Sequence, residues 1–190
     1  MLLVGGGGCD DSSGGAAPAC SCSTPPPPPT EACDQRCADG VALRAMRETL
    51  KLAFNLALQG KPVGPQDATG ACPEGGTFRV VGEATSNALQ GTTTVKLTYT
   101  FEGCVYRQID DEVDENYRMS VTGTLTQEGT IAVQPSATTA LLIRSDDLTL
   151  DGEVYVPAQD YRIEQCPTVL SQTGNAIAGT VCGRAAGFDF

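Results

Sequence analysis

The feature that most constrains the fold is a run of residues whose polarity alternates with a period of two. Its apolar positions are Val95, Leu97, Tyr99 and Phe101, and the residues between them are threonine or lysine. Such alternation is typical of a strand that is buried on one face only. Similar runs follow towards the C-terminus without a helical pattern among them. They predict an antiparallel β-meander of about seven to nine strands over residues 77–183.

Turn-forming residues divide these runs. Residues 127–129 (Gln-Glu-Gly) predict a turn, and Thr-Gly-Asn at 173–175 joins the last two strands. Asp151 and Gly152 either form a tight hairpin turn or lie inside one long strand that contains a glycine. Residues 61–76 are rich in glycine and proline, and we expect a loop there.

One segment repeats its apolar residues at steps of three and four instead of two. Residues 41–59 carry such a stripe, which includes Leu43, Met46 and Leu50. The spacing predicts an amphipathic helix, and we expect Gly40 to interrupt any helical segment before it. A helix of this kind buries its stripe by packing on one face of a sheet. The chain is therefore expected to be α+β and mostly β.

Nine cysteines in 190 residues are typical of a protein in an oxidising compartment. Cys166 and Cys182 lie symmetrically about Gly174, so a hairpin there places them opposite each other. Cys72 and Cys104 flank the first predicted hairpin at matching distances. We predict a disulfide at each of these two pairs.

The cysteines nearer the N-terminus leave several pairings open. Cys33 and Cys37 lie one helical turn apart, where a regular helix holds Cβ atoms farther apart than a disulfide prefers. They can pair in a distorted first turn, or each can pair with Cys20 or Cys22. Four thiolates would also suffice for zinc or cuprous copper, but the spacing matches no common zinc ribbon. We take Cys33–Cys37 as the expected bridge and expect no metal.

Composition excludes several function classes. The chain has no histidine, which rules out Ser-His and Cys-His nucleophiles and histidine-ligated zinc or haem. Its formal net charge is −11, from 12 Lys+Arg and 23 Asp+Glu. Such a surface repels phosphate backbones, so we expect no nucleic-acid partner. We also expect no enzymatic activity and no cofactor.

An acidic run at residues 110–116 separates two of the predicted strands. Its oxygen-bearing side chains could ligate calcium, although the run lacks the EF-hand pattern. We expect a solvated hairpin loop without metal. The weak candidate ligands are Asp110, Asp111, Glu112, Asp114 and Glu115.

The N-terminus carries a short apolar start followed by glycines and a cysteine. The small residues Gly7 and Gly8 immediately precede Cys9, and residues 10–30 are a Ser/Gly/Pro-rich segment that cannot form a packed core. A small-residue run that ends in cysteine before such a tether resembles the uncharacterised bacterial lipoproteins. In that family the cysteine is acylated and becomes the mature N-terminus.

The resemblance implies a division of the chain. Residues 1–9 would be the remnant of a signal peptide whose true start lies upstream of Met1, with Cys9 as the lipidation site. Residues 10–30 would be a disordered tether, and residues 31–190 a single folded domain.

The resemblance also implies a location and a class of function. We expect an exported protein of the bacterial cell envelope or periplasm, bound to a membrane through its lipid, or alternatively secreted and soluble. The expected role is a non-enzymatic binding or structural module with an envelope protein as partner. One alternative is a carrier that holds an apolar ligand between the curved sheet and the helix. The least favoured alternative is a carboxylate-dependent hydrolase, which needs two acids that converge in a cleft.

Overall fold

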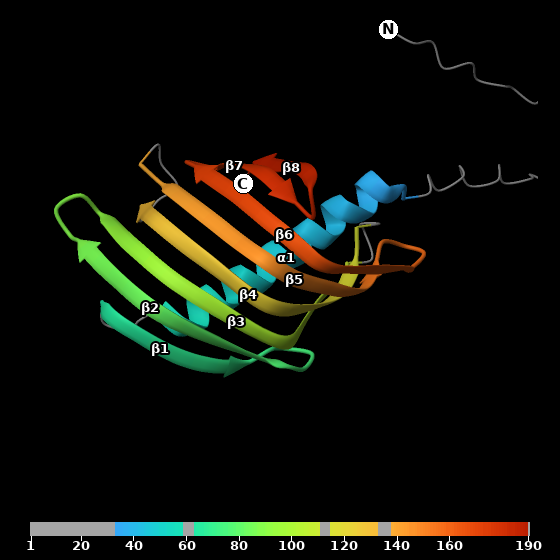
Figure 1. Cartoon of the computed structure of the whole chain (residues 1–190), viewed down its shortest axis with the longest axis horizontal. Coiled ribbons are helices and arrows are strands. Elements are labelled where there is room, and N and C mark those ends of the chain that lie inside the picture. Colours follow the sequence, from blue (N-terminus) through green and yellow to red (C-terminus); the bar gives the residue numbers. More distant parts are fainter. Residues whose placement is uncertain (1–32, 59–62, 111–114, 133–137, 190) are drawn as a thin grey trace, which may run out of the picture. The chain divides into compact units, whose positions relative to one another are not determined.

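The computed structural model describes residues 33–58, 63–110, 115–132 and 138–189. They form one helix and an eight-stranded antiparallel sheet whose strand order follows the sequence from β1 to β8 (Figure 1). The elements are α1 (Gln35–Leu58), β1 (Gly64–Ala71), β2 (Thr77–Asn87), β3 (Thr92–Gln108), β4 (Tyr117–Ala132), β5 (Ala140–Val154), β6 (Gln159–Thr173), β7 (Ala176–Val181) and β8 (Arg184–Asp189). This is the α+β meander that the alternating pattern predicts.

Helix α1 begins six residues before the predicted start. The side chain of Asp34 accepts a hydrogen bond from the main-chain N–H of Cys37 at 2.9 Å, which caps the first turn. The prediction that Gly40 interrupts the helix is wrong. Glycine costs about 1 kcal/mol inside a helix, and the cap together with burial of Val41 and Ala42 offsets that cost.

The expected loop at residues 61–76 contains a strand, β1, which forms one edge of the sheet. It lacks alternating apolar residues, and its Pro65 is tolerated because an edge strand leaves one row of N–H groups unpaired. Gly70 pairs in register with Phe78 of β2. A Cβ atom at Gly70 would lie 2.4 Å from the Phe78 ring, so the aromatic side chain occupies the space above the glycine.

Strands β3 to β5 are longer than the pattern predicts, because glycines let them bend without ending. The predicted turn at residues 127–129 is wrong: these residues lie inside β4 and pair with both neighbours. Gly129 has a φ of 133°, and a Cβ there would lie 2.1 Å from the main-chain oxygen of Ala140. Gly152 likewise lies inside β5, which decides between the two readings of Asp151 and Gly152.

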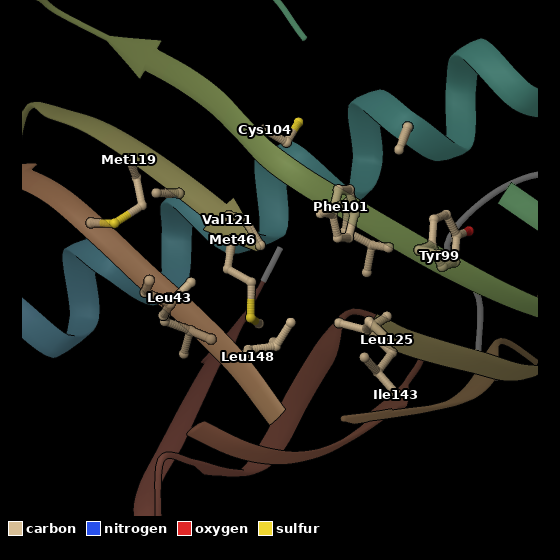
Figure 2. Packing of buried hydrophobic residues seen from close by; sticks show 14 of the residues in the cluster. Leu43, Met46, Tyr99, Phe101, Cys104, Met119, Val121, Leu125, Ile143 and Leu148 are labelled. Atoms are coloured by element: carbon tan, nitrogen blue, oxygen red, sulfur yellow. The ribbon is translucent and has the colours of Figure 1, made fainter. Parts of the chain in front are cut away.

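The core lies between α1 and one face of the sheet, which we call the inner face. Side chains of Leu43 and Met46 on α1 point towards residues of β3, β4 and β5, such as Phe101 and Leu148 (Figure 2). Four alanines on one side of α1 are completely buried: Ala42, Ala45, Ala53 and Ala57. Small side chains let the helix lie close to the sheet and leave little space between them.

Candidate functional site

Three disulfides lie within the described residues, at the pairs that the sequence predicts. Cys72–Cys104 joins the residue after β1 to β3, with Cα atoms 5.4 Å apart. Cys166–Cys182 joins β6 to the residue after β7, with Cα atoms 4.2 Å apart. The first bridge links the end of β1 to β3 across β2, and the second links the consecutive strands β6 and β7. Both restrict the unfolded chain and so stabilise the meander.

The third disulfide joins Cys33 to Cys37 across the start of α1. Its Cα atoms are 5.2 Å apart, within the usual range for a disulfide. The bridge forms because Cys33 precedes the helix, so its backbone does not follow the regular helical spacing. Because Cys33 and Cys37 are joined to each other, neither has a thiolate to offer a metal. Cys9, Cys20 and Cys22 lie outside the described residues.

The acidic run is only partly described. Asp110 and Glu115 lie at its two ends, whereas the candidate ligands Asp111, Glu112 and Asp114 fall outside the described residues. Glu115 forms an ion pair with Arg44 of α1. No group of three acidic, histidine or cysteine side chains in the described part of the chain could hold a metal ion.

Asn116 closes the base of this hairpin. Its side-chain oxygen accepts the N–H of Asp110 at 2.7 Å, and its side-chain nitrogen donates to the Asp110 carbonyl at 3.2 Å. The Asn116 carbonyl accepts the N–H of Tyr155 at 2.6 Å, which also attaches the hairpin to the end of β5. The two ends of the run therefore have structural roles.

The space beside α1 tests the carrier alternative. An apolar hollow between α1 and the inner face has a volume of about 150 Å³. Phe54, Ile131 and Ile177 line it, with Arg47 and Lys51 at the helix side. Ligand pockets are usually about 300–1,000 Å³, so this hollow is too small for a lipid-sized ligand.

A polar cluster attaches the start of α1 to the C-terminal strands. The carboxylate of Asp39 accepts hydrogen bonds from the Tyr161 hydroxyl at 2.9 Å and from Gln35 at 3.0 Å, and it pairs with Arg184 at 2.8 Å. Burial, and then the hydrogen bond to Asp39, raise the pKa of Tyr161 above its usual value. With its carboxylate fully engaged, Asp39 acts as an anchor between helix and sheet.

Other buried polar side chains of the described residues also have hydrogen-bond partners. The Tyr99 hydroxyl donates to the side-chain oxygen of Gln127 at 2.6 Å inside the core. Burial raises the pKa of Tyr99 and of Tyr117. Among the described residues, no buried side-chain nitrogen or oxygen lacks a hydrogen-bond partner. These hydrogen bonds offset the cost of burying the polar groups.

The described hollows do not bring two acids together. Single carboxylates line three of them: Glu102 near β1 and β2, Asp39 at the start of α1, and Glu153 at the end of β5. A carboxylate-dependent hydrolase needs an acid and a base that converge on one substrate. None of these hollows has such a pair.

The hollow at the end of β5 contains a feature that the sequence reasoning missed. Two arginines, Arg107 of β3 and Arg118 of β4, line it together with Tyr155 and Val156. A signal for the pair exists in the sequence, because the two arginines lie at equal distances from the middle of the acidic hairpin. An arginine on an outward position of a strand otherwise looks like ordinary surface.

Comparison with protein-family models, with curated proteins and with solved structures found no match to the chain. Within the described residues, no helix is long and apolar enough to cross a membrane.

Proposed function

We propose that this chain is a tethered module of the bacterial cell envelope, attached to a membrane through a lipid on Cys9, with a binding or structural role and no catalytic one. The observation that carries the proposal is an interior closed by disulfides and filled with side chains. Figure 2 draws the packing of α1 residues such as Met46 against the sheet. Disulfides at Cys72–Cys104 and Cys166–Cys182 favour an oxidising compartment, which agrees with export.

Two further observations support a module over the alternatives. The apolar hollow beside the middle of α1, at about 150 Å³, is too small for a lipid, and the larger hollow of about 500 Å³ at the start of α1 is lined by the charged side chains of Arg36, Asp39 and Arg184. The described hollows that contain a carboxylate contain one each, which argues against a hydrolase. A tether of residues 10–30 would hold the module away from the membrane and leave its surface accessible to an envelope protein.

The tether is tested by the intact mass of the mature protein, purified from membranes of its native cell. We expect the mass of a chain that begins at Cys9 with added acyl groups, since two or more acyl chains give stable anchoring. The matched control is Cys9→Ser, which should lose the acyl mass and leave the membrane fraction. An unacylated wild-type protein that retains residues 1–8 would contradict the anchor.

The role as a module is tested separately from the anchor. Solvent extraction of the purified protein should release no bound lipid in a one-to-one ratio with the chain. A stoichiometric lipid would contradict the module and support the carrier instead, whatever the state of Cys9.

A further inference from the structure

We propose that the hollow formed by the ends of β3, β4 and β5 is a binding site for a small oxyanion, a phosphate or carboxylate group that carries an apolar substituent. Arg107 and Arg118 would hold the anion. This inference goes beyond the proposed function and does not depend on the lipid anchor.

The two arginines face the same side of the sheet and lie next to each other. Arg107 and Arg118 are direct cross-strand partners in the register of β3 and β4. Each is exposed, and the buried residues Tyr117 and Met119 flank Arg118 in sequence. Because side chains alternate along a strand, both arginines lie on the outer face, away from α1. Directly opposed side chains have Cβ atoms about 5 Å apart, which is close enough for both guanidinium groups to contact one anion.

This juxtaposition is unfavourable without a counter-charge. Like charges directly opposite each other across two strands destabilise a sheet. No carboxylate of the described residues forms an ion pair with either Arg107 or Arg118. The basic residues that do form such pairs there are Arg44, Arg47, Lys51, Arg79, Lys96, Arg162 and Arg184. Within the described residues, Arg107 and Arg118 are therefore adjacent arginines that form no ion pair, and a bound anion would supply the counter-charge.

The hollow next to the arginines suits a ligand with an apolar part. Its volume is about 530 Å³, within the usual size of a small-molecule site. Its lining includes Ile109, Tyr155 and Val156, of which Ile109 and Val156 are exposed although apolar. An anion held in the forks of two arginines, with its substituent against these side chains, would use both kinds of surface.

One lining residue opposes an anion. Glu153 of β5 is the register partner of Arg118, yet their side chains form no ion pair. Its carboxylate would repel a bound oxyanion across a short distance. We therefore expect that replacing Glu153 by a neutral residue strengthens anion binding.

The test is isothermal titration calorimetry of the full 190-residue chain with phenyl phosphate and with inorganic phosphate at low salt. We expect both to bind, phenyl phosphate more tightly, and both more weakly as salt is added. The double variant Arg107→Gln, Arg118→Gln should lose at least about tenfold in affinity, since each lost charged hydrogen bond weakens binding by roughly that factor. The variant Glu153→Gln should bind more tightly than the wild type.

The matched control is Arg144→Gln, which removes the same charge from an exposed arginine of β5 outside the hollow. It should bind phosphate as the wild type does. Thermal melting adds a readout that does not require binding: without anion, the single variant Arg107→Gln should melt no lower than the wild type, because it relieves a like-charge contact.

Three results would overturn the proposal. The wild type could fail to bind either phosphate, or the control Arg144→Gln could weaken binding as much as the double variant, which would indicate a non-specific charge effect. Binding could also appear only after Asp111, Glu112 and Asp114 are replaced by their amides. That result would mean that the chain's own acidic run is the occupant.

Discussion

Removal of the three disulfides one at a time, by paired Cys→Ala substitutions, should destabilise the domain in the order of the loops that they close. The sequence separations are 4 residues for Cys33–Cys37, 16 for Cys166–Cys182 and 32 for Cys72–Cys104. A disulfide limits the freedom of the unfolded chain, and a longer loop loses more freedom. The chain-entropy relation gives about 1.9, about 3.1 and about 3.7 kcal/mol respectively.

The three contributions should be additive, because none of the loops overlaps another in sequence. Their sum is about 9 kcal/mol, which is comparable to the whole stability of a typical small domain. The fully reduced domain should therefore be marginally stable, although each single variant should still fold.

The assays are urea unfolding and thermal melting of each oxidised variant, both followed by far-ultraviolet circular dichroism. The loss of Cys72–Cys104 should lower the melting temperature by roughly 7–15 °C, and the loss of Cys33–Cys37 by about half as much. The control is Thr85→Ala at an exposed position of β2, which should change stability by less than about 0.5 kcal/mol. The reasoning is refuted if removing Cys33–Cys37 costs as much as removing Cys72–Cys104.

Three other predictions follow from single features of the fold. The substitution Gly129→Ala should destabilise the sheet by more than about 3 kcal/mol in urea unfolding, because the new Cβ would meet a main-chain oxygen 2.1 Å away. The substitution Asp39→Ala should cost about 1–3 kcal/mol, because it leaves the hydroxyl of buried Tyr161 without its acceptor; Asp39→Asn should recover part of that loss. Burial raises the pKa of Tyr99, Tyr117 and Tyr161, so the folded state favours their neutral forms. That stability is fully present below pH of about 10 and is lost as the pH rises further, so tyrosinate absorbance of these three groups should appear together with unfolding and not before it.

The sequence predicts an element well where its polarity pattern is local and regular. The alternation around Tyr99 predicts β3 because successive side chains of a half-buried strand point alternately to the core and to solvent. The same pattern does not predict β1, since an edge strand with Gly70 under the Phe78 ring has no apolar alternation to detect. It also misplaces a turn at Gly129, because glycine serves both to end strands and to bend them.

Symmetry about a hairpin is the second local signal, because residues at equal distances from the turn lie opposite each other on the two strands. It predicts the disulfide Cys166–Cys182 from positions along the chain. The same symmetry about the acidic hairpin places Arg107 opposite Arg118. Sequence alone does not mark this pair as a site, because arginines are common on the exposed face of a strand. The hollow itself needs Tyr155 at the end of β5, which only the folded sheet brings to this position.

The sequence alone therefore determined the mostly β class, the disulfides Cys72–Cys104 and Cys166–Cys182, and the amphipathic helix, because each depends on spacing along the chain. Only the tertiary structure decided how α1 packs, through alanines such as Ala45 and Ala53 that carry little hydrophobic signal of their own. It also decided that Arg107 and Arg118 share one hollow with residues of β5. Packing and cross-strand proximity depend on contacts between segments far apart in sequence, and a one-dimensional pattern does not contain those contacts.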